Sequence, residues 1–496
     1  MDALSGLVSG FAVILTLQNL YYCFLGSLIG TLVGVLPGVG PLAAMALLLP
    51  VTFTVTPMAG MVMLASIFYG AMYGGSTTSV LLNIPGEAAS VVTCIDGHQM
   101  ARQGRAGAAL GIAALGSFIA GTLGVLIMTF FAPAISAVAI RFGPPENFAL
   151  MVLGLVCTLF MITGSPVKGA LMIALGFLSA AVGIDVVNGT ERFTFGTVEL
   201  TGGLELLAVV IGLFGVAEVL ANVEEVVQGT LLTERIRNLW PTLADWRASW
   251  WPILRGSGLG FILGLVPGGG PVTASFVSYA LEKRISPTPE RFGKGAIEGV
   301  AGPESANNAA VAGSMIPILS LGIPGNPVTA LLLGALIIQG IQPGPLFVTQ
   351  RPDLFWGIVA SMYVGNVFLL ILNLPLVGLW AQLLRVPYHI LFPVVLLLCV
   401  VGTYSANKNV FDLWVMLGFG VGGYVLRKLE YDLAPFVIAF VLAPLMEQSL
   451  RQSLVMSPDG AMILLYRPVT AVLLAAALLL VALMFRRKAK SVGGKP

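Results

Sequence analysis

The chain has 496 residues, of which 57% are hydrophobic and only 10% are charged, and its formal net charge at pH 7 is +2. Soluble domains carry about 25% charged residues, so this composition excludes a fully water-facing surface, and the small net charge excludes a basic surface for nucleic acid. The mean hydropathy of +0.95 indicates a protein whose main solvent is lipid.

Apolar stretches recur along the whole chain and predict about eleven to fourteen membrane elements, since a helix needs about 20 apolar residues to cross a bilayer. In chain order the candidate elements are 11–36, 42–56, 58–85, 106–138, 146–163, 167–187, 202–228, 252–266, 271–281, 300–322, 325–348, 354–384, 388–402, 409–426, 432–450 and 468–485. Two of them, 42–56 and 271–281, are too short to cross alone and are interpreted as half-helices or hairpin arms. The sequence therefore predicts an all-α polytopic membrane protein with broken helices and re-entrant hairpins.

The longest polar interruption, 229–251, divides the chain near its middle. We expect a first membrane repeat over 1–228, a polar linker over 229–251 and a second membrane repeat over 252–450. The segment 451–496 contains a last membrane helix and ends in the basic sequence FRRKAKSVGGKP. Basic clusters next to membrane helices favour the cytoplasm, so we expect the C-terminus there.

Two phrases occur twice and indicate an internal repeat. Residues 34–41 are GVLPGVGP and residues 264–271 are GLVPGGGP, whereas residues 82–86 are LNIPG and residues 321–325 are LGIPG. The copies of the first phrase are 230 residues apart (264 minus 34), and those of the second are 239 apart (321 minus 82). The similar offsets predict two related halves with a small insertion in the second.

The distribution of basic residues predicts how the halves are oriented. In the first half the loop 50–57 has no charge and the loop 98–105 has Arg102 and Arg105; in the second, the loop 282–294 has four basic residues and 339–353 has only Arg351. The basic loop therefore changes place between the halves, which favours inverted repeats. A parallel duplication with scattered charges is the alternative.

The repeated phrases break helices and expose backbone that can bind an anion. Proline donates no N–H, glycine permits unusual backbone angles, and a proline can begin the next helix. A helix start carries partial positive charge, so we expect substrate at these breaks. The predicted binding residues of the breaks are Pro37, Gly38, Gly40, Pro41, Pro85, Gly86, Pro267, Gly268, Gly270, Pro271, Pro324 and Gly325.

Polar side chains cluster beside the breaks in otherwise apolar sequence. Further predicted substrate-binding residues are Ser76, Thr77, Thr78, Asn83, Asn307, Asn308, Ser314 and Asn326, and the candidates for coupling to a cation are Glu87, Glu304, Ser79 and Ser320. The alternative for any single hydroxyl is packing between helices. Asp96 and Glu298 are interpreted as residues at the water interface, and Glu218 is as compatible with a side-chain partner as with transport.

These phrases resemble the large membrane subunit of the tripartite tricarboxylate transporters, the TctA type. The resemblance spans nearly the whole chain and rests on GVLPGVGP, YGGSTTSVLLNIPGEAAS (73–90), GLVPGGGP, GPESANNAAVAGSMIP (302–317) and LGIPGNP (321–327). It implies a permease in the bacterial inner membrane that works with a small four-helix membrane subunit (TctB type) and a periplasmic solute-binding protein (TctC type). It also implies ion-driven import of carboxylates such as citrate.

The leading hypothesis is therefore uptake of a di- or tricarboxylate with a cation gradient, Na⁺ or H⁺, by an elevator-like movement that other broken-helix carriers suggest. A passive channel for a small organic anion is the alternative. An enzyme is not favoured, because His98 and His389 lie outside the polar clusters and no hydrolase motif is present. No cofactor and no structural metal are expected apart from the transported ion.

Overall fold

The computed structural model of the chain describes residues 2–36, 40–162, 165–185, 188–224, 238–384 and 388–492. Within these residues the fold is helical apart from one short antiparallel hairpin, in which β1 (Gly183–Ile184) pairs with β2 (Glu191–Arg192). This confirms the prediction of an all-α architecture.

The helices that precede the middle of the chain include six of 15 residues or more, separated by short ones. They are α1 (Ala3–Ile14), α2 (Leu17–Val35), α3 (Gly40–Thr52), α4 (Pro57–Leu82), η1 (Ala88–Ser90), α5 (Val91–Arg102), α6 (Ala106–Ala139), α7 (Pro144–Met161), α8 (Pro166–Ala180), η2 (Val198–Leu200), α9 (Leu206–Val210), the π-helix η3 (Ile211–Val216) and α10 (Ala217–Glu224). Because α9, η3 and α10 form one continuous helix over 206–224, the six long helices are α2, α4, α6, α7, α8 and this continuous run.

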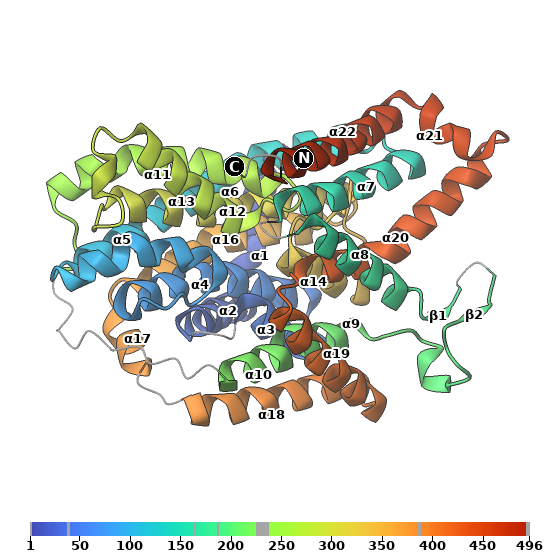
Figure 1. Cartoon of the computed structure of the whole chain (residues 1–496), viewed down its shortest axis with the longest axis horizontal. Helices are drawn as coiled ribbons and strands as arrows, with labels where there is room; N and C mark the ends of the chain where they lie inside the picture. Colours follow the sequence, from blue (N-terminus) through green and yellow to red (C-terminus); the bar gives the residue numbers. More distant parts are fainter. Residues whose placement is uncertain are drawn as a thin grey trace.

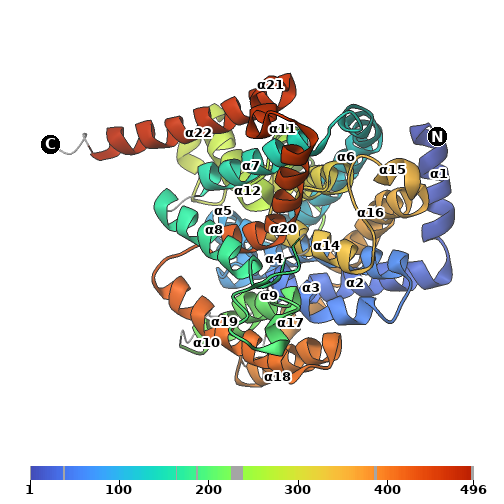
Figure 2. The same ribbon diagram turned by 90° about the vertical axis from the view of Figure 1, so that its right-hand side faces the viewer.

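The helices that follow the middle are α11 (Leu243–Leu265), α12 (Gly270–Ile285), η4 (Pro289–Arg291), α13 (Glu298–Ile316), the π-helix η5 (Pro317–Leu321), α14 (Pro327–Ile338), α15 (Phe347–Gln350), α16 (Pro352–Asn373), α17 (Val377–Leu383), α18 (Tyr388–Asn407), α19 (Val410–Lys428), α20 (Ala434–Met456), η6 (Gly460–Met462), α21 (Ile463–Tyr466) and α22 (Pro468–Val492). Figure 1 shows α11, α12 and α13 together, above α2, α4 and α5. In Figure 2, α22 extends from the body on the side opposite α1.

Many of these helices fit a membrane. By length and composition, seven of the described helices can cross a bilayer, or nine if each of two bent helix pairs is one span. One bent pair is α1 with α2, which meet at 87°. Shorter apolar helices, α3 and α14 among them, are too short to cross alone. The chain is therefore a multi-pass membrane protein.

Two helix pairs pack so closely that their backbones touch. On α2, Gly26, Gly30 and Gly34 face α4, and a Cβ atom added at Gly30 would lie 2.5 Å from the carbonyl oxygen of Ile67. On α11, Gly256, Gly260 and Gly264 face α13 in the same way, and a Cβ at Gly260 would lie 2.1 Å from the carbonyl oxygen of Ala306. Small residues at every fourth position give a helix one flat face, which permits this approach.

The two pairs use matching positions. Gly30 and Gly260 are 230 residues apart, and their contacts Ile67 and Ala306 are 239 residues apart. These are the offsets that separate the two repeated phrases in the sequence. The same packing rule therefore operates in both halves of the chain.

Two helix boundaries and the burial of one side chain differ from the sequence-based expectations. The expected loop 98–105 is helical up to Arg102, and α11 begins at Leu243 within the expected linker, because Thr242 and Asp245 form a capping box. Asp96 was expected at a water interface but is fully buried. Its carboxylate accepts hydrogen bonds from the backbone N–H groups of Gly293, Gly295 and Ala296 at 2.7–2.9 Å, and so joins the two halves.

We predict that Gly260→Ala destabilises the protein by about 1–3 kcal/mol or more, because the added methyl group overlaps a backbone oxygen that cannot rotate away. The matched control is Gly258→Ala on the same helix, where an added Cβ meets nothing within 4 Å. The control should change stability by less than about 1 kcal/mol. Thermal unfolding of the detergent-solubilised variants checks this, and equal melting temperatures for the two would refute the packing role.

Candidate functional site

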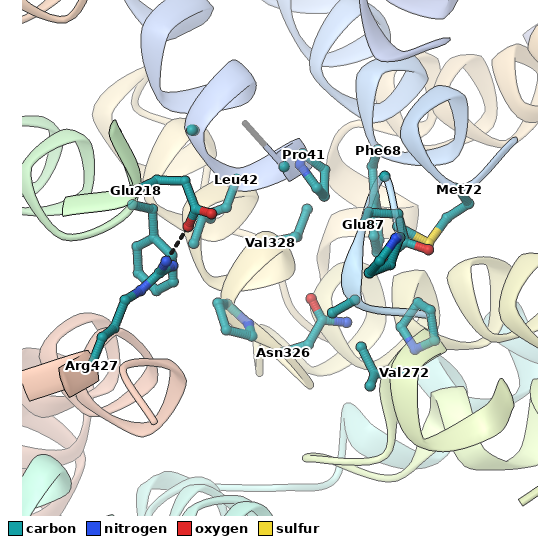
Figure 3. A pocket seen from close by; sticks show the side chains of 18 residues that line it. Pro41, Leu42, Phe68, Met72, Glu87, Glu218, Val272, Asn326, Val328 and Arg427 are labelled. Atoms are coloured by element: carbon teal, nitrogen blue, oxygen red, sulfur yellow. Dashed lines mark hydrogen bonds and ion pairs between the residues drawn. The ribbon is translucent and has the colours of Figure 1, made fainter. Parts of the chain in front are cut away.

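A cavity of about 450 Å³ lies where the broken segments of the two halves meet. Figure 3 shows its walls, to which the polar side chains Glu87, Asn326, Glu218 and Arg427 contribute. The lining residues are Gly40, Pro41, Leu42, Ala43, Phe68, Met72, Pro85, Gly86, Glu87, Ala88, Phe214, Glu218, Pro271, Val272, Asn326, Pro327, Val328 and Arg427. Three of the four phrase copies therefore border one space, and the residues directly after the fourth copy, Asn326 to Val328, border it too.

Three helices begin at the cavity wall. The first turns of α3, α12 and α14 line it through Pro41, Pro271 and Pro327, which stand at or next to the first helical position. Proline fits there because the N–H groups of a first helical turn have no partner within the helix. The remaining N–H groups and the helix dipoles make such starts attractive to negative charge. Three starts around one cavity give it a positive polarisation.

Glycines make the breaks possible. Gly40, Gly268 and Gly270 have φ angles of +61°, +80° and +52°, which side chains with a Cβ seldom adopt. The backbone N–H of Gly268 donates to the carbonyl oxygen of Gly325 at 2.6 Å, so the two phrases of the second half are joined directly. In the first half a Cβ at Gly86 would lie 1.9 Å from the carbonyl oxygen of Gly34, which places the second phrase against the end of α2.

Glu87 borders the cavity from the first half. It is the N-cap of η1, where one carboxylate oxygen accepts the backbone N–H of Ala89 at 2.7 Å and Ser90 completes a capping box. The side chain is almost fully buried, with 7% of the residue exposed. Its other oxygen, Oε1, has no hydrogen-bond partner within the described part of the chain. This oxygen is available to a cation or to a hydrogen-bond donor.

Asn326 borders the cavity from the second half at the corresponding position, 239 residues after Glu87. It is the N-cap of α14, where Oδ1 accepts the backbone N–H of Thr329 at 2.9 Å and Thr329 completes the capping box. The residue is 9% exposed, and its amide nitrogen Nδ2 has no acceptor among the described residues. A buried donor without a partner costs free energy, which a ligand that accepts the bond would recover.

The third wall comes from segments near the end of each expected half. The last turn of α19 supplies Arg427, which forms an ion pair with Glu218 of α10. Phe214 of η3, together with Phe68 and Met72 of α4, adds apolar surface. The cavity thus combines helix starts, one cation, two carboxylates and apolar walls, which suits a small organic anion.

The structure brings some predicted site residues to this cavity and places others elsewhere. Those that line it are Gly40, Pro41, Pro85, Gly86, Glu87, Pro271 and Asn326. Those that do not are Ser76, Thr77, Thr78, Ser79, Asn83, Pro267, Gly268, Gly270, Asn307, Asn308, Ser314, Ser320, Pro324, Gly325 and Glu304. Pro37 and Gly38 lie outside the described residues.

Several of the polar side chains outside the cavity serve packing. Thr78 donates to the carbonyl oxygen of Val35 at 2.5 Å, and Ser79 donates to that of Ser90 at 3.0 Å. These bonds follow the packing alternative for hydroxyls between helices. Asn83 instead ends α4 in the left-handed conformation, with φ of +59°.

Glu304 lies at the centre of a second polar cluster, between α13, α5 and α6. It is fully buried; its carboxylate accepts a hydrogen bond from Thr93 and, at 3.2 Å, one from the amide of Asn307. The amide of Asn308 donates to Ser117 of α6 at 2.8 Å. The carboxylate therefore has partners within the protein, whereas Glu87 keeps one oxygen open.

Arg427 was not among the residues predicted from the sequence, and Glu218 was considered only as a residue with a partner or a role in transport. The predicted site residues lie in and beside the broken phrases, and Arg427 lies about 100 residues after the last of these phrases. Its position at the end of an apolar helix is also common for residues at a membrane surface. The one signal in the sequence was the presence of Glu218 in an apolar run, since a buried carboxylate calls for a cation.

Comparisons with known proteins show the family of the chain. Residues 20–438 match the family model described as "Tripartite tricarboxylate transporter TctA family". An "Uncharacterized 52.8 kDa protein in TAR-I ttuC' 3'region" of Agrobacterium vitis is 50% identical over 96% of this chain and 95% of its own length. An "Uncharacterized protein in TAR-II ttuC' 3'region" of the same organism is 51% identical over 45% of this chain and 93% of its own length.

No solved structure matches the chain significantly. The family match covers most of the sequence, including all four copies of the repeated phrases. The chain therefore belongs to the tripartite tricarboxylate transporter TctA family and is a multi-pass membrane component of a transporter.

Proposed function

We propose that this chain is the permease subunit of a binding-protein-dependent secondary transporter, and that it imports a di- or tricarboxylate together with Na⁺ or H⁺. The substrate would bind in the cavity between the broken segments. The observation that carries the proposal is the amide nitrogen of Asn326, which has no acceptor among the described residues, in a cavity bordered by three helix starts.

The chemistry of the cavity supports an anion. Backbone N–H groups at helix starts and a primary amide donate hydrogen bonds, and a carboxylate accepts several at once. Donors held in fixed positions at membrane depth are less screened than donors in water. The apolar side chains of Phe68, Met72 and Val328 can cover the carbon skeleton of such a substrate.

The same cavity supports coupling to a cation. Import of an anion into a negatively charged cell interior requires that positive charge move with it. Oε1 of Glu87 has no partner within the described residues, so it can take a proton or serve as an oxygen ligand for Na⁺. Among the coupling candidates, this open oxygen favours Glu87 over Glu304, whose carboxylate already has partners.

The two-fold arrangement supports alternating access. In this proposal the halves are inverted repeats, and the two broken regions move together against the remaining helices in an elevator-like manner. The protein would lie in the bacterial inner membrane with its C-terminus in the cytoplasm. A small TctB-type membrane subunit and a periplasmic TctC-type binding protein would complete the transporter.

The first test replaces one atom of the proposed site. Asn326→Asp keeps an oxygen that can cap α14, because Asp and Asn are equally good N-caps, but it replaces the amide donor with a negative oxygen. We expect kcat/KM for uptake of citrate and succinate into proteoliposomes containing the complete transporter to fall at least about tenfold.

The matched control is Asn409→Asp. Asn409 caps α19 by accepting the backbone N–H of Phe411 at 2.9 Å, and it does not line the cavity. Uptake by this variant should equal that of the unmodified chain. Unchanged uptake by Asn326→Asp, with the protein inserted normally, would contradict the proposed substrate site.

The second test concerns coupling. Glu87→Gln keeps an oxygen that can accept the N–H of Ala89 but cannot change its charge. We expect exchange of substrate across the membrane to persist, while accumulation driven by an imposed Na⁺ or H⁺ gradient is lost. Glu304→Gln should still accumulate substrate.

Counterflow and gradient-driven uptake, measured on the same proteoliposomes, separate these outcomes. If Glu87→Gln accumulates substrate as the unmodified chain does, coupling does not pass through Glu87. If the unmodified chain shows neither saturation nor a response to any imposed gradient, the passive channel replaces the transporter as the better description.

A further inference from the structure

The ion pair between Glu218 and Arg427 is the one charged contact in the cavity wall. Both residues line the cavity, and Figure 3 shows the pair on the side away from Glu87. Arg427 is the only cation among the described lining residues. Its side chain is 31% exposed and that of Glu218 is 23% exposed, so neither is sealed within the helices.

The cavity offers an anion no free cation while this pair is closed. The charges of Arg427 and Glu218 cancel while the two side chains are paired. In the present arrangement the only cation is directed to Glu218. A substrate with one carboxylate at the helix starts therefore has no cation for a second carboxylate, although the cavity contains one.

The geometry points to a second carboxylate subsite: we propose that Arg427 binds a distal carboxylate of the substrate, and that Glu218 occupies this place in the empty cavity and is displaced when substrate enters. This inference rests on the proposed carboxylate site and adds to it the residue that would distinguish di- and tricarboxylates from monocarboxylates.

Local structure favours such an exchange. Glu218 lies in the first turn of α10 directly after the π-helix η3, a form that is uncommon and often occurs at functional sites. The side chain of Asn222 donates to Oε1 of Glu218 at 3.2 Å, so Glu218 keeps a partner when Arg427 leaves. A guanidinium has several N–H donors, so it can pair with the carboxylate of Glu218 or with a carboxylate of the substrate.

The exchange also lowers the free-energy cost of distinguishing di- and tricarboxylates from monocarboxylates. A cation left unpaired at membrane depth is unfavourable, and Glu218 removes that cost while the cavity is empty. A monocarboxylate that binds only at the helix starts leaves the ion pair intact and gains nothing from it. A substrate with a second carboxylate gains the contact with Arg427. Its net gain in binding free energy is that of the new contact minus the free energy needed to separate Arg427 from Glu218.

The test measures dissociation constants of citrate, succinate and acetate for the purified full-length chain by isothermal titration calorimetry. Arg427→Gln should weaken the binding of citrate and succinate about tenfold to a hundredfold and leave that of acetate within about twofold. Glu218→Gln should tighten the binding of citrate by roughly twofold to fivefold, since it removes a competitor of modest strength.

The matched control is Arg467→Gln. Arg467 forms an ion pair with Glu146 at 2.9 Å and does not line the cavity, so none of the three constants should change. Arg427→Lys keeps the charge without the planar fork and should bind citrate with intermediate affinity.

The outcomes separate this inference from the function on which it rests. If the unmodified chain binds citrate, Asn326→Asp weakens that binding and Arg427→Gln does not, the Arg427 subsite is wrong and the carboxylate site stands. Equal losses for acetate and citrate in Arg427→Gln would also overturn the distal subsite. If the unmodified chain binds none of the three anions, both proposals fail.

Discussion

The constraint on which this structure depends is that a helix broken at membrane depth exposes backbone groups, and these must be buried in protein or must line a cavity. The glycine faces of α2 and α11 satisfy it. Their last glycines, Gly34 and Gly264, lie against Ala71 and Ala310 just before the two breaks. Because the helix axes are so close there, the second phrase of each half reaches the first, as the bond from Gly268 to Gly325 shows.

This packing determines the electrostatics of the cavity. Close approach in each half brings helix starts to one space, and their dipoles favour negative charge in it. The two halves contribute different groups at corresponding positions, a carboxylate at Glu87 and an amide at Asn326. Each side chain caps a helix within a capping box, yet Glu87 has an acceptor and Asn326 a donor without a partner among the described residues. This difference between two side chains gives the cavity a donor side and an acceptor side.

The sequence predicted the framework well and the second polar cluster poorly, for a physical reason. Proline and glycine act on the backbone where they stand, so the breaks at 37–41 and 267–271 could be located without knowing what surrounds them. Side chains on a helix are different, because spacing says which residues share a face but not what that face meets. Asn307 and Asn308 lie on α13, and Asn308 meets Ser117 of α6 rather than the cavity. Arg427 reaches the cavity only through the packing of α19 against η3 and α10, which no local pattern encodes.

Sequence spacing therefore does not separate polar side chains that bind a ligand from those that join helices. Whether each buried polar atom has a hydrogen-bond partner in the protein is a further criterion. Thr78 and Ser79 donate to backbone carbonyls, and Glu304 accepts from Thr93 and Asn307, so these side chains stabilise the helices that they join. Glu87 and Asn326, which both line the cavity, each use one side-chain atom for the fold, and the other atom has no partner among the described residues. Since an open polar atom is costly at membrane depth, its retention on both sides of one cavity is better explained by a ligand than by stability.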